Sequence, residues 1–599
     1  MPFRIVYLLP LHCLTIPSAI SLIWLLPSYA SEPRNAASNI TPVVSIADKL
    51  AQNSPAPPVN TRPDPNRDRL PQPLPTPAPL PEQRDPILTP PTPETQPSQS
   101  DVRISITKVN VVGSTIFGAK EIDPIVKPLE GRSVTLDELR QAADSITQLY
   151  LRRGYITSKA VVVNQTITDG VVQIRVIEGS LEKIQVEGTK RLNHSYVRSR
   201  IRLGADKPLN SNDLEEQLRL LRINPLFDNV EASLSAGSKL GESILTVRVK
   251  EADSFQAVLG VDNYTPPRIA PERGGVYLRY LNLTGIGDEI TASYNFGLNF
   301  DDFDRAASNV YDVTYRVPIN PMNGTIQFRA APNNNKLINP PIEEPFSDVK
   351  GSSDFYELSY RQPLVRSLRE EFALSTAFAF QGNSGSFRLN GDSTSIAPSR
   401  TRVLKFGQDY LRRDNKGVWA AQSQFNFGLD IFDATVSSDD NTPDGRFVSW
   451  FGQVQRVQRL GNDNLLILQA DLQLTPDDVP SFYEFFVGGG QSLRGYRQNA
   501  RSGDNGYRLS VEGRVPILRN KKKVPTLQLT PFVELGQVWN NNSRDIDDSF
   551  LASAGLGLLW QPSQNLNIRV DYGVPFLDIE TPSDSLQDNG LHFSLTYSP

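Results

Sequence analysis

The 599-residue sequence contains very little cysteine and histidine, with one cysteine and three histidines in total. Cys13 and His12 lie in an apolar N-terminal stretch, and His194 and His592 are far apart in the rest of the chain. Outside that stretch the chain offers no disulfide, no thiol nucleophile and no His or Cys metal site. It also offers no histidine-based catalytic triad. We therefore expect a protein that is not an enzyme, with no catalytic residues, no metal-binding residues and no cofactor.

Long apolar runs are missing after residue 30. No later stretch offers the eighteen or so apolar residues that a membrane-spanning helix requires. Residues 1–30 have the form of a secretory signal peptide, in which Arg4 precedes an apolar stretch ending at Leu26 and residues 28–30 (SYA) supply a cleavage site. An uncleaved membrane anchor is the alternative interpretation of this segment. Both interpretations predict export.

The chain also lacks an excess of basic residues. It has 61 Lys and Arg against 66 Asp and Glu, which gives a formal net charge of −5. This balance gives no reason to expect a nucleic-acid partner. The sequence shows no GxxxxGK[ST] phosphate-binding motif either, so nucleotide hydrolysis is not expected to drive its function. We expect no small-molecule substrate.

Proline, by contrast, is concentrated in residues 31–101. About a third of the 47 prolines lie between Pro55 and Pro97, and such low-complexity sequence cannot bury a core. We expect this segment to be a disordered linker with extended polyproline character. A short amphipathic stretch at 43–52 could form a helix that plugs a pore, and disordered linker is the alternative there.

Residues 102–179 and 180–252 repeat one order of elements, which is strand, helix, helix, strand and strand. Each copy has about seventy to eighty residues, so this is an internal repeat of a small α/β module. The module resembles the POTRA domain, a periplasmic domain that binds passing chains by adding them to the edge of its sheet. Two unrelated ferredoxin-like domains are the alternative. The predicted elements include strands at 104–113, 156–163 and 171–178 and a helix at 135–153 in the first copy, and strands at 181–188, 227–234 and 243–250 and helices at 196–203 and 211–224 in the second.

From residue 253 to residue 599 the pattern changes to short alternating segments without a convincing helix. Examples are VYLRYLNL (276–283), EITASYNFG (289–297) and LNIRVDYGV (566–574). Alternation with period two in segments of about ten residues is typical of a transmembrane β-barrel, with apolar side chains outward and polar ones inward. A water-soluble barrel or sandwich is the alternative.

The connections between these segments alternate between short and long. Short turns alternating with long polar loops are what outer-membrane barrels show, and the soluble repeats are expected on the short-turn side. Counting the connections predicts a barrel of about sixteen antiparallel strands. The predicted long loops are 264–273, 299–308, 332–354, 381–400, 433–445, 475–505, 540–549 and 575–589.

The sixth long loop contains residues 485–506, FFVGGGQSLRGYRQNARSGDNG. Glycine at this density lets a backbone fold tightly or approach a wall closely. Between the glycine-rich turns lies a Leu-Arg-Gly-Tyr tetrad with a single positive charge. The residues in question are the tetrad Leu493, Arg494, Gly495 and Tyr496, and the glycines Gly488, Gly489, Gly490, Gly503 and Gly506.

Two POTRA-like repeats, about sixteen strands and this tetrad in the sixth loop resemble the outer-membrane transporters of two-partner secretion. This is the TpsB family, which includes the haemolysin secretion/activation proteins of the ShlB/FhaC/HecB type. The resemblance covers residues 102–599. It implies an outer-membrane protein with POTRA domains in the periplasm, which bind a large exported partner protein in an unfolded state. The partner then passes through the barrel to the cell surface or medium.

The resemblance also implies a site. In that family the sixth loop folds back into the barrel lumen, and its arginine pairs with an acidic residue on strand thirteen. Here that strand reads PFVELG (531–536), so Glu534 is the candidate partner of Arg494. The family more often has aspartate at this position, and glutamate adds a methylene. A solvated arginine on an external loop is the alternative.

Two other functions stay open at this point. An outer-membrane assembly factor that inserts other barrels shares the Arg-Gly-Tyr signature, and a passive porin shares the barrel. A porin has no use for periplasmic repeats. We expect a monomer that contacts outer-membrane lipid.

Overall fold

The structure is a computed structural model of the whole chain, and it describes residues 88–89, 103–298, 308–336, 346–389, 392–437, 444–541, 546, 549–579 and 585–599. The predicted signal peptide, the helix candidate at 43–52 and nearly all of the predicted linker lie outside the described residues. Within the described ranges, no helix has the length and apolar character needed to cross a bilayer.

Residues 103–179 form the first α/β module. Helix α3 begins after Thr135, which accepts a hydrogen bond from the Glu138 amide at 3.2 Å, while the Glu138 carboxylate accepts from the Thr135 amide at 2.7 Å. This reciprocal cap satisfies two backbone donors at the start of the helix. The buried face of α3, including Ile146 and Tyr150, packs in one core with Ile174. The elements are β2 (Arg103–Ile106), β3 (Lys108–Val112), α2 (Ala119–Val126), β4 (Arg132–Thr135), α3 (Leu136–Arg152), β5 (Lys159–Val162) and β6 (Val171–Ile177), with one sheet in the order β3-β6-β5 and a separate β2–β4 pair.

Three details differ from the sequence-based expectation for this module. The single strand predicted at 104–113 is divided into β2 and β3, which pair with β4 and β6 respectively. Strand β4 lies between the two helices, where none was predicted, and it pairs with β2. The strand predicted at 156–163 is shorter, because the backbone turns before β5 and the Ser158 amide donates to the Tyr155 carbonyl at 3.0 Å.

The second module has the order strand, helix, helix, strand and strand, without a counterpart of β4 in the described residues 180–252. Its apolar core includes Val197, Leu214, Leu218, Leu245 and Val247, all fully or nearly fully buried. The elements are β7 (Ser180–Glu187), α4 (His194–Ile201), α5 (Ser211–Arg222), β8 (Phe227–Ala236) and β9 (Glu242–Glu251). The sheet order is β1-β8-β9-β7, in which β1 (Leu88–Thr89) comes from the proline-rich segment and pairs parallel with β8.

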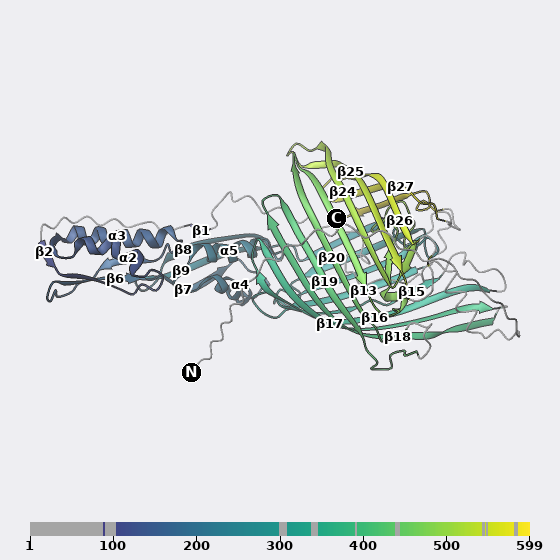
Figure 1. Cartoon of the computed structure of the whole chain (residues 1–599), viewed down its shortest axis with the longest axis horizontal. Helices are drawn as coiled ribbons and strands as arrows, with labels where there is room; N and C mark the ends of the chain where they lie inside the picture. The colour runs from purple at the N-terminus through teal and green to yellow at the C-terminus, as the bar shows by residue number, and fades with distance from the viewer. Residues whose placement is uncertain are drawn as a thin grey trace, which may run out of the picture. The chain divides into compact units, whose positions relative to one another are not determined.

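The remaining strands form a closed antiparallel barrel (Figure 1). It has sixteen strands, because β14 and β15 are successive parts of one strand that pair with β13 and β16. The first strand closes on the last, with Gly260 opposite Thr596. The strands are β10 (Phe255–Asp262), β11 (Glu272–Leu281), β12 (Glu289–Leu298), β13 (Ser308–Pro318), β14 (Thr325–Ala330), β15 (Asn333–Lys336), β16 (Phe346–Arg366), β17 (Glu370–Leu389), β18 (Asp392–Asp414), β19 (Gly417–Gly428), β20 (Val448–Gly461), β21 (Asn464–Leu474), β24 (Asn505–Arg519), β25 (Pro525–Trp539), β26 (Phe550–Trp560), β27 (Leu566–Pro575) and β28 (Leu591–Tyr597). The prediction of a sixteen-stranded barrel preceded by two α/β modules is confirmed.

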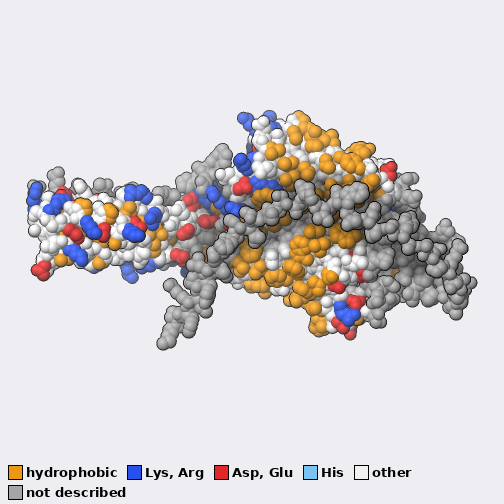
Figure 2. All heavy atoms as spheres, viewed as in Figure 1, with side chains coloured by type: hydrophobic (Ala, Val, Ile, Leu, Met, Phe, Trp, Pro, Cys, Tyr) orange, Lys and Arg blue, Asp and Glu red, His pale blue; other side chains and the backbone are white. Residues whose placement is uncertain are grey.

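Side chains alternate across the barrel wall as a lipid-facing barrel requires. Apolar side chains lie on the outer face, where Leu558 is 44% exposed, and they form broad orange areas on the barrel in Figure 2. Charged side chains point inward and pair across strands, for example Arg329 with Asp312 at 2.7 Å and Lys405 with Glu357 at 2.6 Å.

Two of the predicted loops are wrong. Much of 332–354 and nearly all of 381–400 belong to strands β15 to β18, which reach beyond the neighbouring strands at one end of the barrel (Figure 1). Alternation is missing there because both faces of these strand ends carry mainly small and polar side chains. Strand pairing holds them extended nonetheless, as in the opposition of Ser386 to Ser395.

Candidate functional site

The tetrad lies in loop 6, which we define as residues 475–504, between β21 and β24. These are the eleventh and twelfth barrel strands, as predicted. Within the loop, β22 (Phe485–Val487) and β23 (Arg501–Gly503) form a short hairpin. Leu493 and Tyr496 are buried with Phe485, Val538 and Leu551 in an apolar cluster, the last two of which come from the barrel wall. Loop 6 therefore packs against the inside of the barrel.

Arg494 is held by Glu534 of β25, the thirteenth strand. The Glu534 carboxylate accepts from the Arg494 guanidinium at 2.6 Å (Nη2–Oε1) and 3.1 Å (Nε–Oε1), and from the Arg494 backbone amide at 2.7 Å (N–Oε2). The Ser510 hydroxyl also donates to Oε1, at 3.0 Å. Both side chains are nearly fully buried, each at 4% exposure. The structure thus brings together the two residues that the sequence paired.

The geometry differs in one respect from the two-pronged pair that an arginine and a carboxylate usually form. Both guanidinium donors meet the same oxygen of Glu534, while the other oxygen accepts the backbone amide. The carboxylate therefore binds side chain and main chain of the loop together. The Arg494 guanidinium also lies over the Phe532 ring, at 3.6 Å from its centroid.

Sequence reasoning missed further charged residues around Arg494. Its Nη1 donates to Glu512 of β24 at 2.8 Å and to Asp571 of β27 at 3.2 Å. Arg569 bridges the same two carboxylates, at 2.7 Å from Glu512 and 2.6 Å from Asp571, and Arg514 donates to Glu512 at 2.9 Å. Together with Glu534 these are three arginines and three carboxylates, so the formal charges cancel. We call this group of six the loop-6 anchor.

One sequence pattern could have indicated Glu512, Arg514, Arg569 and Asp571, namely two charged residues that lie two positions apart on one strand. Glu512 and Arg514, and likewise Arg569 and Asp571, share the inward face of their strands because side chains alternate with period two. That pattern marks inward charges, but it does not show which strands meet around loop 6.

Gly495 approaches the wall closely. Its φ of 97° is a left-handed conformation that favours glycine. A Cβ at Gly573 of β27 would lie 2.5 Å from the Gly495 nitrogen. The Gly495 amide donates to Nε2 of His592 at 3.2 Å. One of the two histidines to which the sequence assigned no role therefore lies at the site.

The other predicted glycines lie at the base and turns of the loop. Gly488 and Gly489 have positive φ values of 107° and 105°. Gly490 leaves room for the Tyr264 ring, Gly503 lies in β23 against the Trp539 backbone, and Gly506 lies in β24 against the Phe485 ring.

Loop 6 is also tied to the connection between β27 and β28. Arg497 pairs with Asp588 at 2.6 Å, and the Gln498 amide donates to the Gln587 side chain at 2.8 Å. The Tyr496 hydroxyl donates to the Ala552 carbonyl of β26 at 2.9 Å. The chemistry of the whole site is ion pairing and hydrogen bonding that hold a loop inside a barrel.

Substituting Gly573 by alanine tests how closely the loop must approach. The added methyl group is expected to destabilise the docked loop by about 1–3 kcal/mol, the usual effect of overpacking. A cysteine at Ser492, which is buried in the docked loop, should then react with a membrane-impermeant maleimide about tenfold faster, since 1.4 kcal/mol corresponds to a factor of ten. Gly382→Ala is the matched control, because a Cβ there meets nothing within 4 Å. Equal labelling rates in the two variants would contradict the proposed close contact.

Comparison with known proteins places the chain among outer-membrane secretion proteins. A family profile described as "Haemolysin secretion/activation protein ShlB/FhaC/HecB" matches residues 241–559, and "POTRA domain, ShlB-type" matches residues 104–179. The outer membrane transporter CdiB of Escherichia coli O6:K15:H31 is 23% identical over 71% of both chains. The heme/hemopexin transporter protein HuxB of Haemophilus influenzae strain 86-028NP is 22% identical over 81% of this chain and 86% of its own length. The solved structure of CdiB from Escherichia coli matches with a TM-score of 0.63 at 20% identity, over 87% of this chain and 94% of that one.

Proposed function

Because the chain belongs to the haemolysin secretion/activation family (ShlB/FhaC/HecB), we propose that it captures its unfolded partner through its POTRA domains and passes it through a barrel that loop 6 obstructs at rest. It is an outer-membrane transporter of two-partner secretion, with its POTRA domains in the periplasm. The proposal concerns how it does this.

The observation that carries the proposal is the position of loop 6. The loop fills part of a closed barrel and is fastened to the wall by the loop-6 anchor, so an extended chain needs it to move. Ion pairs and hydrogen bonds suit this task, because they can be exchanged for contacts with a passing chain. Folding of the partner outside the cell supplies the driving force.

Capture of the partner is assigned to the sheet edges of the POTRA modules. A strand edge exposes unpaired amide and carbonyl groups, which bind an extended segment with little regard to its sequence. In the second module the β8 edge is covered by Leu88 and Thr89 of the chain's own β1, so a partner segment that pairs with β8 replaces β1.

We also propose that the transporter is a monomer. The pairing of β10 with β28 closes the barrel within one chain, so in the described residues its seam leaves no strand edge that a second copy must cover.

Deleting the gene tests the proposal against its alternative, an assembly factor that inserts other barrels. Transport of a partner predicts the loss of one or a few proteins from the surface and medium, with other outer-membrane barrels at normal levels. Quantitative mass spectrometry of the medium and of the outer membrane measures both. Depletion of many barrels would support the assembly factor, and an unchanged secretome would end the transport assignment. Expression of the intact gene should restore the lost protein.

A further inference from the structure

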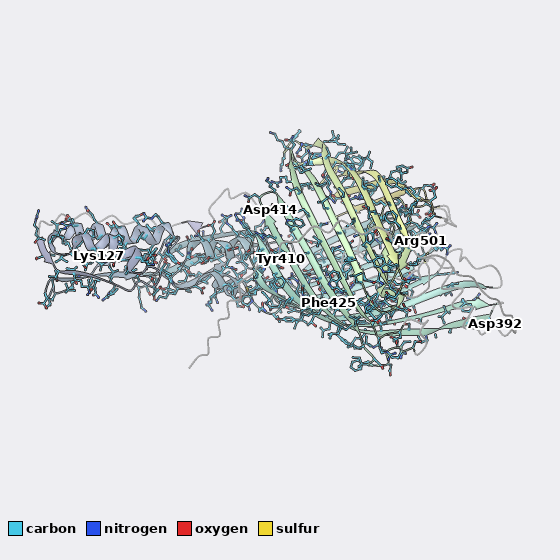
Figure 3. The ribbon with its side chains drawn as sticks, viewed as in Figure 1. Lys127, Asp392, Tyr410, Asp414, Phe425 and Arg501 are labelled. Atoms are coloured by element: carbon cyan, nitrogen blue, oxygen red, sulfur yellow. The ribbon has the colours of Figure 1, made fainter. Side chains whose placement is uncertain are left out.

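Strands β16, β17 and β18 continue beyond the apolar outer surface of the barrel. The last outward-facing aromatic or large apolar residues of this stretch are Tyr356 on β16, Phe380 on β17 and Leu404 on β18, which are 43%, 37% and 40% exposed. Beyond Phe380 the chain of β17 runs on to Leu389 with mainly small and polar residues. Asp392 lies at the far tip of these strands (Figure 3). This tip is on the cell-surface side, because the opposite turn at Leu368 bonds to Glu216 of the second POTRA module.

One edge of this extension is open within the described residues. β18 pairs with β17 from Asp392 to Arg412, apart from the register shift at Ala397 and Pro398, but with β19 only from Val403 onward. The chain after β19 covers two further positions, since the Leu429 amide donates to the Arg402 carbonyl and the Thr435 amide to the Arg400 carbonyl, both at 2.8 Å. From Ser399 to Asp392, the part of the chain that the structure describes supplies no strand on that side. The open edge is roughly 25 Å long.

The open edge has few of the features by which proteins protect strand edges. Such edges usually carry lysines, prolines, bulges or covering loops, because they otherwise pair with other chains. Here residues 393–397 are Ser, Thr, Ser, Ile and Ala, without a charge. Pro398 and the register shift between Asn383 and Gly385 limit the edge on its barrel side. Ile396 is 41% exposed, so an apolar side chain on this strand also lacks cover.

We propose that the edge of β18 from Asp392 to Ala397, beyond Pro398, is a template on which the first emerging segment of the partner pairs as a β-strand. The occupant is an extended chain, because unpaired backbone amides and carbonyls are satisfied by another strand. The inward faces of β16 to β18 continue from the lumen wall to the tip, so a chain leaving the barrel reaches this edge without leaving the surface of the protein. Pairing there fixes the first strand of the partner, and the rest of the partner folds onto it. This inference rests on the proposed function.

Site-specific disulfide capture tests the proposal in the full-length transporter in outer membranes. The Cys13→Ala background carries a single cysteine at Ser395, on the open edge, or at Ser352 as the matched control. Ser352 lies on β16 at the same end of the barrel but is paired on both sides, with Asn334 and Ser384. The probe is the protein lost in the deletion strain, fused at its C-terminus to a domain that folds before export and carrying cysteines along its first emerging segment.

The Ser395→Cys variant should capture the stalled partner about tenfold more than the Ser352→Cys variant, and the captured partner positions should alternate with period two. Equal capture, or capture without that alternation, would overturn the template. A dominant disulfide between two copies of the transporter would assign the edge to self-association instead. If the unmodified transporter does not export the partner, that result counts against the proposed function and not against the template.

A second variant measures the consequence for folding. Ser395→Lys adds the charge that natural edges use, and Ser352→Lys is the control. We expect the exported amount to stay within about twofold, while the partner becomes protease-resistant at the surface about threefold more slowly in the Ser395 variant only. Heat-modifiable mobility shows whether both variants assemble in the outer membrane. If both assemble and the partner folds at the same rate with each of them, the template role is overturned.

Discussion

Replacing Arg494 by alanine is expected to abolish export of the partner while the barrel still assembles. Without Arg494, Glu534 keeps only the Ser510 hydroxyl and a main-chain amide as partners in the part of the chain that the structure describes. The anchor is then left with two arginines and three carboxylates, and removing one partner of a buried pair costs about 3–5 kcal/mol. This energy shifts the equilibrium between the docked loop and its undocked positions more than a hundredfold toward the undocked ones. An undocked loop still lies in the lumen but has no defined position, so we expect it to block the path of the partner.

The barrel itself should survive this change, because Arg494 belongs to the loop and not to a strand. The expected result is a normal amount of heat-modifiable protein in the outer membrane and no partner in the medium. Arg519→Ala is the control, since Arg519 pairs with Asp463 at a short turn where the side chains are 33% and 60% exposed. Exposed pairs contribute only about 0–1 kcal/mol, so this control should export normally. Export by the Arg494 variant at the control's level would remove the loop-6 anchor from the mechanism.

Replacing Glu512 by alanine is expected to have a larger effect on the barrel than on the loop. Glu512 accepts from Arg494, Arg569 and Arg514 at 2.7–2.9 Å, and the latter two belong to the wall. Its removal leaves three buried arginines with two carboxylates, Glu534 and Asp571. The penalty for an unpaired buried charge, about 3–5 kcal/mol, then applies to strands that must pair for the barrel to close. We expect little folded barrel in the outer membrane, and therefore little export.

Two variants isolate this effect. Glu357→Ala removes another carboxylate of the lumen wall, but one with a single cationic partner among the described residues, Lys405, so a smaller loss of folded barrel is expected. Glu512→Gln keeps the shape and an acceptor oxygen, so it should restore part of the folded protein. The measurement is the folded fraction in outer membranes by heat-modifiable mobility, together with its unfolding midpoint in urea. A Glu512→Ala barrel as abundant and as stable as the Glu357→Ala barrel would contradict the role of Glu512.

The sequence by itself determined the strand count and the position of loop 6 between strands eleven and twelve, whereas the resemblance to the family implied the pairing of Arg494 with Glu534. Strand count follows from alternation, which is a local consequence of a wall with lipid on one side and polar groups on the other. Once the strands are counted, a resemblance to the family's loop and strand thirteen is enough to name both residues. The same local rule explains the errors at 332–354 and 381–400. Those strand ends leave the lipid, both faces become polar, and the alternation ends although the strands do not.

Only the tertiary structure decided which other side chains meet Arg494 and its neighbour Gly495. Glu512, Asp571 and His592 lie on β24, β27 and β28, and nothing in the spacing of these residues links them to residue 494. They converge because the barrel closes β28 onto β10, which curves the inner faces of these strands around loop 6. The open edge of β18 has the same origin, since it depends on where β19 stops pairing. The alternation of residues along a strand shows which of its faces meets lipid. The contacts at loop 6 and the open edge of β18 depend instead on strand register and barrel closure, which bring together residues far apart in the chain.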